Sequence, residues 1–190
     1  MSVESGDQEI NQDDRRKYLI EGLLKERPEY ENMQIPSDAG KQKILLRSLM
    51  NIRMPKKMDY AFLQIQDAYL SEENEKKGIV TLADIREAQP DLYIWKGDIT
   101  RLRVGAIVNA ANSGMTGCYQ PCHNCIDNCI HTYAGIQLRN YCNNMMIEQG
   151  QEEPTGQAKI TPAFNLPCDH VIHTAHSAFY IEAENSLKSK

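Results

Sequence analysis

Apolar residues recur at helical spacing in three segments of the first half of the chain. The three segments are residues 15–24, 41–50 and 59–75. In the third segment the apolar stripe comprises Phe62, Ile65, Tyr69 and Leu70. Asp59 is a suitable N-cap for this helix, and Gly78 follows two lysines at its end. We interpret the stripes as packing surfaces, so the pattern predicts a helical extension over residues 13–88 after a disordered polar tail over residues 1–12.

From residue 90 onward, short apolar runs that end in polar or small residues alternate with helical spacing. The apolar runs are residues 92–95, 106–109, 157–164 and 170–174. Residues 105–108 lack alternation, which is typical of a strand buried on both faces. Residues 126–141 have helical spacing, so the pattern predicts an α/β layer sandwich over residues 89–190. In such sheets ligands bind at the carboxyl ends of strands, where Asn109 and Asn112 fall.

Length, charge and the distribution of apolar residues limit the class of protein that this chain can be. A length of 190 residues allows one compact domain with an appendage, or two very small domains. A formal net charge of -5 and a pI near 5.6 argue against a nucleic-acid-binding protein that relies on bulk electrostatics. The N-terminus has no apolar signal-peptide core, and no stretch approaches the roughly 20 apolar residues that span a bilayer. We therefore expect a cytoplasmic protein with no nucleic-acid partner and no membrane association.

All six cysteines and all five histidines lie between residues 118 and 176. In a reducing compartment such a cluster indicates metal binding or catalysis more often than disulfides. Cys118, His123 and Cys125 have the spacing Cys-x4-His-x-Cys, and this set of thiolate and imidazole ligands favours zinc. Three protein ligands leave a position for water or a substrate oxygen, whereas four make a structural site. Candidates for a fourth ligand are Cys122, Cys129 and His131. The alternative to a metal site is a reduced, buried cysteine cluster.

Four polar residues and one histidine have two interpretations each. Asp127 falls in the first turn of a predicted helix, where it is either a partner of the helix dipole or an N-cap. Alternatively, it points into a pocket beside the metal, where it could bind a ribose hydroxyl or act as a general base. Asn109 and Asn112 suit sugar hydroxyls, but asparagine also tolerates tight turns. Asp98 follows Gly97, and a turn or helix cap is the simpler interpretation there than contact with a base. His173 lies inside an apolar strand, which favours a core histidine.

The order of several motifs resembles the macrodomain family, whose members bind ADP-ribose. The motifs are Trp95-Lys96-Gly97-Asp98-Ile99-Thr100, Ala106-Ile107-Val108-Asn109-Ala110-Ala111-Asn112-Ser113, Asp127 with Ile130-His131, Ala134-Gly135, and Val171-Ile172-His173-Thr174. Residues 117–125 stand where ordinary macrodomains carry a glycine-rich loop. This replacement resembles the zinc-dependent branch, the microbial protein-ADP-ribose hydrolases, which also carry a helical N-terminal extension. The resemblance implies a three-layer α/β/α sandwich over residues 89–190.

The resemblance also implies which residues bind ADP-ribose. Asp98 and Ile99 would hold the adenine end. Asn109 and Asn112 would lie near the distal ribose, and Asp127 would contact that ribose. The modified protein would be the second partner. Relatives in this family are associated with lipoyl-carrier proteins that a sirtuin-like ADP-ribosyltransferase modifies.

The implied reaction is hydrolysis of the N- or O-glycosidic bond between the distal ribose and a protein side chain. Cys118, His123 and Cys125 would bind zinc, which would polarise a ribose or water oxygen. The resemblance assigns catalytic roles to Asp127 and Asn112. A non-catalytic ADP-ribose-binding module and a structural-zinc interaction module are the alternatives.

The resemblance ends soon after the strand that contains His173. The family continues there with a glycine-containing loop, a helix, another strand and a second phosphate-binding loop. Here residues 178–190 resemble the back half of that helix, so we expect a macrodomain that is shortened at its C-terminal end.

Overall fold

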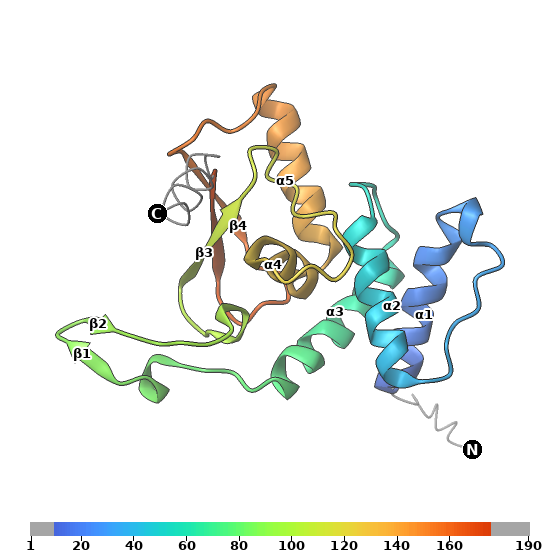
Figure 1. Cartoon of the computed structure of the whole chain (residues 1–190), viewed down its shortest axis with the longest axis horizontal. Coiled ribbons are helices and arrows are strands. Elements are labelled where there is room, and N and C mark those ends of the chain that lie inside the picture. Colours follow the sequence, from blue (N-terminus) through green and yellow to red (C-terminus); the bar gives the residue numbers. More distant parts are fainter. Residues whose placement is uncertain (1–9, 176–190) are drawn as a thin grey trace, which may run out of the picture.

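The computed structural model describes residues 10–175, which form a helical part beside an α/β part (Figure 1). The helical part consists of α1 (Gln12–Lys25), α2 (Ala39–Ile52) and α3 (Tyr60–Lys76). Asn11, Asp38 and Asp59 cap these helices, each accepting a hydrogen bond from a backbone N–H of the first turn. Asp59 is the predicted cap. The first two helices begin earlier than the apolar spacing predicts, because the capping side chain and not the first apolar residue determines the start.

The predicted apolar stripes form the core of the helical part. Its buried side chains are Leu19, Ile20, Leu23, Leu24, Leu46, Leu49, Met50, Phe62, Tyr69 and Leu70, together with Ile136 from the α/β part. Ile65 is half-buried against this cluster. The interpretation of the stripes as packing surfaces is therefore confirmed. Of the tail predicted over residues 1–12, residues 1–9 lie outside the described part, and Asn11 is the cap of α1.

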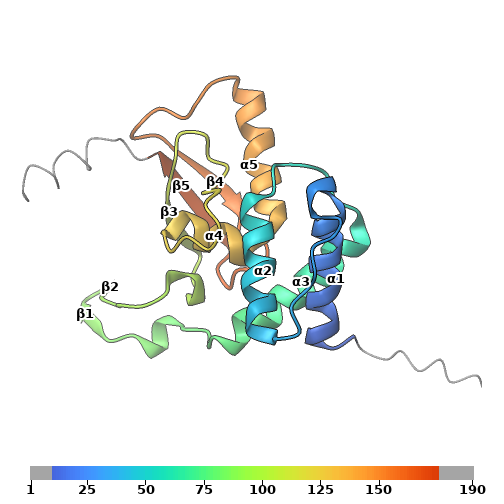
Figure 2. The same cartoon turned by 45° about the vertical axis from the view of Figure 1, so that its right-hand side comes forward.

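A three-stranded mixed sheet forms the centre of the α/β part. It has the order β3-β5-β4, where β3 (Ala106–Ala111) is parallel to β5 (His170–Ala175) and β4 (Ala158–Pro162) is antiparallel to β5. Two helices, α4 (Ile126–Ala134) and α5 (Ile136–Gln149), pack against the sheet (Figure 2). The strands predicted around residues 106–109, 157–164 and 170–174 are confirmed, and with them the α/β class. Short 3-10 helices complete the elements: Pro28–Tyr30, Leu82–Asp84 and Ile99–Arg101.

One prediction about strands is wrong, and another is confirmed only in part. Residues 105–108 are not buried on both faces, because β3 alternates exposed and buried residues and Val108 is 53% exposed. In the described part, α4 and α5 cover one face of the sheet, and Ile160 of β4 is also exposed. The apolar run 92–95 is a strand only at its start. Only Leu92–Tyr93 (β2) is a strand, and it pairs with Glu87–Gln89 (β1) in an exposed hairpin away from the larger sheet (Figure 1).

The segment predicted as one helix over residues 126–141 is two helices. Gly135 has φ 97°, a value that favours glycine, and it ends α4 and begins α5. A side chain at this position would meet Gln66, because a Cβ would lie 2.7 Å from its Nε2. The Gln66 side chain instead accepts a hydrogen bond from the Ile136 N–H. Apolar spacing continues across the break, so periodicity alone does not reveal it.

Among residues 10–175, no helix combines the length and apolar character needed to cross a membrane. The predicted helix remnant at residues 178–190 and the expected C-terminal shortening concern the chain beyond the described residues.

We expect Ile130→Ala to lower the free energy of unfolding by about 2–5 kcal/mol, because truncating a large buried side chain removes apolar contacts and leaves a cavity. Ile130 is fully buried between α4 and the sheet. Ile147→Ala is the matched control in α5, since Ile147 is 68% exposed, and it should change stability by less than about 0.5 kcal/mol. Urea unfolding followed by circular dichroism measures both, and equal losses in the two variants would contradict the described core.

Candidate metal centre and polar pocket

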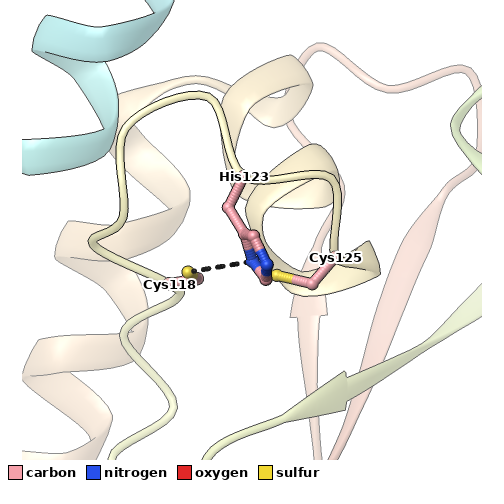
Figure 3. A group of neighbouring side chains, drawn as sticks. All are labelled: Cys118, His123 and Cys125. Atoms are coloured by element: carbon pink, nitrogen blue, oxygen red, sulfur yellow. Dashed lines mark hydrogen bonds between the residues drawn. The ribbon is translucent and has the colours of Figure 1, made fainter.

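The loop between β3 and α4 brings three predicted ligands together. Cys118, His123 and Cys125 point toward one another (Figure 3). Their ligand atoms all lie within 4.8 Å of one another, and Cys118 Sγ lies 3.7 Å from His123 Nδ1. Zinc bonds of about 2.3 Å to sulfur and about 2.0 Å to nitrogen separate the two atom types by roughly 3.5 Å in a tetrahedron. The residues therefore fit a zinc ion in both their chemistry and their spacing.

Local backbone features explain the shape of this loop. Gly117 has φ 85°, and a Cβ there would lie 2.8 Å from the ring of His131, so the position requires glycine. Cys125 is the N-cap of α4, where its Sγ accepts a hydrogen bond from the Asn128 N–H at 3.4 Å. Burial is the main effect that raises the pKa of the Cys125 thiol. The hydrogen bond from the Asn128 N–H lowers this pKa and the neighbouring Cys118 sulfur raises it, and the net result is a raised pKa. A cation bound beside the two sulfurs would favour their thiolate forms.

The three candidates for a fourth ligand lie outside this group. Cys122 Sγ lies 3.2 Å from Ser48 Oγ of α2, and Cys129 Sγ lies 3.7 Å from Arg47 Nη2 of the same helix. His131 is buried behind the loop. The described loop thus brings together three candidate ligands, the number that an open zinc site uses.

The Asp127 carboxylate lies next to the side chains of Asn109 and Asn112. Its Oδ1 accepts a hydrogen bond from Asn109 Nδ2 at 2.8 Å, and its Oδ2 lies 3.5 Å from Asn112 Nδ2. Asp127 is not the N-cap, because Cys125 has that position, but its carboxylate lies in the first turn of α4, as a partner of the helix dipole would. Burial raises the pKa of Asp127, while the hydrogen bond from Asn109 and the charge of Arg139 act in the opposite direction.

The two asparagines differ in exposure. Asn112 is exposed and also donates a hydrogen bond to the Gly117 carbonyl at 3.1 Å. Asn109 is fully buried, and its amide bonds Asp127 and His173, so its direct contact with a ligand stays a prediction. The turn of the chain after β3 thus leaves the Asn112 side chain exposed next to the buried carboxylate of Asp127.

His173 is a satisfied core histidine, as its place in an apolar strand predicts. Its Nε2 lies 3.0 Å from Thr161 Oγ1, and its Nδ1 lies 3.1 Å from Asn109 Nδ2. Burial lowers the pKa of His173 to about 4. His131 is also buried, and neither ring nitrogen has a hydrogen-bond partner within the described residues. Burial, with the charge of Arg139, lowers the pKa of His131 well below its usual value.

Asp98 does not join the group around Asp127 through any contact in the described chain. Its Oδ1 accepts hydrogen bonds from the N–H and the hydroxyl of Thr100, at 2.9 and 2.6 Å, so the capping interpretation is confirmed. Its Oδ2 lies 3.8 Å from Lys77 Nζ. Ile99 packs against the core of the α/β part. Binding of adenine by these two residues stays a prediction.

Sequence reasoning missed the residues that hold the loop from behind. Arg139 of α5 donates from Nε to the Thr116 carbonyl at 2.7 Å, and Asn51 of α2 accepts from the Cys122 N–H at 2.9 Å. Both side chains are buried. An arginine or asparagine within a helix is ordinary in a sequence, and no spacing signal distinguishes these two.

Comparisons with known proteins agree with the motifs. Residues 108–189 match the family model of the Macro domain. A protein-ADP-ribose hydrolase of Treponema medium is 61% identical over 169 residues, which cover 87% of this chain and 65% of the relative. The protein-ADP-ribose hydrolase of Staphylococcus aureus (strain MRSA252) is 42% identical over 161 residues, covering 84% of this chain and 60% of the relative. The chain thus spans less than two thirds of the length of these relatives.

A solved structure, the Trypanosoma brucei macrodomain in complex with ADP-ribose, aligns with 69% of this chain and 59% of its own, at 23% identity and a TM-score of 0.47. The Macro domain match falls on the α/β part, and the mixed sheet with its covering helices agrees with that fold.

We expect the free energy of unfolding to fall as the pH decreases from 6.5 to 4. His131 and His173 are neutral in the native state, whereas in the unfolded chain they bind protons below about pH 6.5. The unfolded state then binds more protons than the native state, so acid destabilises the fold. For His173 alone the loss approaches about 3 kcal/mol at pH 4.

Denaturant unfolding of the metal-free protein at several pH values measures this dependence. Burial of Asp127 acts in the opposite direction, so variants isolate the histidine contribution. His131→Leu should reduce the slope, and His170→Gln, which removes an exposed histidine, should leave it unchanged. An unchanged slope in His131→Leu would count against a neutral, buried imidazole.

Proposed function

We propose that this chain is a zinc-dependent hydrolase that removes ADP-ribose from modified protein side chains. The observation that carries the proposal is the convergence of Cys118, His123 and Cys125 beside the buried carboxylate of Asp127. A three-ligand metal site next to polar groups is the arrangement that hydrolytic zinc enzymes use. The names of the relatives, protein-ADP-ribose hydrolases, support the same reaction.

In this proposal different polar residues bind the ribose and transfer the proton. Asn112, which is exposed, offers an amide donor and an acceptor to a ribose hydroxyl. Asp127, with its raised pKa, is suited to accept a proton from a hydroxyl or a water molecule. Asn109 holds the Asp127 carboxylate through the hydrogen bond to its Oδ1. Asp98 and Ile99 would bind the adenine end at the edge of the same part of the fold.

When bound by Cys118, His123 and Cys125, zinc supplies a Lewis acid beside this pocket. The three ligands come from one loop, and their spacing supports a single ion with one position left for a ligand from solution.

The substrate is a protein that carries ADP-ribose on a side chain, through an N- or O-glycosidic bond. A reducing, cytoplasmic location agrees with six cysteines that are all free in the described structure. Lipoyl-carrier proteins modified by a sirtuin-like ADP-ribosyltransferase are the first candidates to assay.

We expect Cys125→Ala to lose most of the bound zinc and most of the ADP-ribose release, because two ligands hold a metal far more weakly than three. Elemental analysis and release of ADP-ribose from a modified protein measure the two effects. Cys168→Ala is the control, since Cys168 is buried in the core of the α/β part and outside the loop. Full zinc content in Cys125→Ala, or none in the unchanged protein, would contradict the metal assignment.

We expect Asp127→Ala to keep its zinc but to lose about 10²–10⁴-fold in turnover, the usual contribution of a positioned general base. Calorimetric titration with free ADP-ribose should give saturable binding for the unchanged protein. Unchanged turnover in Asp127→Ala would remove its catalytic role. Saturable binding without any hydrolysis in the unchanged protein would instead favour a non-catalytic ADP-ribose-binding module.

A further inference from the structure

Helix α2 of the helical part contacts the ligand loop directly. Arg47 Nη2 donates to the His123 carbonyl at 2.7 Å and to Asn128 Oδ1 at 3.0 Å. Asn128 in turn donates to the carbonyls of Cys118 and Gln120, at 3.3 and 2.9 Å. One side chain of α2 is therefore linked, directly or through Asn128, to the backbone beside two of the three candidate ligands.

Asn51, one turn further along α2, holds the middle of the loop. Its Oδ1 accepts a hydrogen bond from the Cys122 N–H at 2.9 Å, and its Nδ2 donates to Thr132 Oγ1 of α4 at 2.9 Å. Cys122 has φ 53°, a left-handed conformation that is unfavourable for a residue with a side chain. The bond to Asn51 stabilises this conformation, which reverses the chain before His123.

The same helix contacts the two thiols nearest to the site that are not in the ligand group. Cys122 Sγ lies 3.2 Å from Ser48 Oγ and 3.6 Å from the Ile44 carbonyl. Cys129 Sγ lies 3.7 Å from Arg47 Nη2. Thiolates are strong zinc ligands, so either sulfur would complete a closed, four-ligand site if it reached the ion.

We propose that α2 determines the geometry of the metal site. It positions the loop so that Cys118, His123 and Cys125 converge, and it keeps Cys122 and Cys129 out of the ligand set. The proposal rests on the proposed zinc site. Arg47 and Asn51 are positioning residues, because they act through the loop. The helical extension thus determines that the coordination stays open to a ligand from solution.

The first test uses the metal-free protein and does not depend on zinc. Hydrogen exchange at the Cys122 N–H should be about fivefold faster in Asn51→Ala, because one hydrogen bond contributes roughly 1 kcal/mol. Lys41→Ala, at the opposite end of α2 and exposed, is the control and should leave this exchange unchanged. Equal exchange in Asn51→Ala and the unchanged protein would overturn the role of Asn51.

The second test counts sulfur ligands by X-ray absorption of the zinc-loaded protein. The unchanged protein should show two sulfurs, and Arg47→Met should show a third as Cys129 becomes free to bind. Adding Cys129→Ser to Arg47→Met should return the count to two, and Arg47→Lys, which keeps a cation, should retain two. Circular dichroism establishes that each variant is folded.

The outcomes separate the two proposals. If the unchanged protein holds no zinc, the proposed zinc chemistry fails, while hydrogen exchange still decides whether α2 positions the loop. If it holds zinc with two sulfurs and Arg47→Met has the same ligands and the same affinity in chelator competition, the role of α2 in selecting the ligands is overturned.

Discussion

The arrangement of the two parts depends on one buried guanidinium. Arg139 is 4% exposed, and its Nη1 donates to the carbonyls of Asn51 and Arg53 at 2.7 Å each, at the C-terminal end of α2. Carbonyls there have no partner inside the helix and form the negative end of its dipole, so a cation is favourable. The Nε of the same group donates to Thr116, at the start of the ligand loop. One side chain of α5 therefore joins the helical part, the loop and the sheet-covering helices.

The charge of Arg139 also acts on the groups around the site. Burial lowers the pKa of Arg139, but an arginine remains protonated at neutral pH. The cation counteracts the burial of Asp127 and disfavours protonation of His131. Tyr119 of the loop stacks on the guanidinium at 4.3 Å, which shields this charge from solvent on one side. The carboxylate thus has a fixed positive neighbour whether or not a metal is bound.

A line of hydrogen bonds across the sheet determines where the Asp127 carboxylate lies. Because the Asn109 Nδ2 is a donor, His173 Nδ1 accepts and its Nε2–H points to Thr161 Oγ1. The line runs through residues of β4, β5 and β3 before it reaches α4. Because Asn109 is itself held by His173, the carboxylate that it bonds has less freedom to reorient, which is the preorganisation that proton transfer requires.

The sequence alone determined the class of the fold, most strands and helices, and the three candidate ligands. These follow from local physics: apolar periodicity, capping side chains such as Asp59, and a Cys-x4-His-x-Cys spacing short enough for one loop to bring its ligands together. Tertiary structure decided the rest. The exposure of Val108, the break at Gly135, and the separation of Cys122 and Cys129 from the ligand group depend on what packs against each element. The hydrogen bond between Arg47 and the His123 carbonyl joins residues far apart in the chain. No local sequence pattern encodes such a contact, because it depends on how the two parts of the fold pack together.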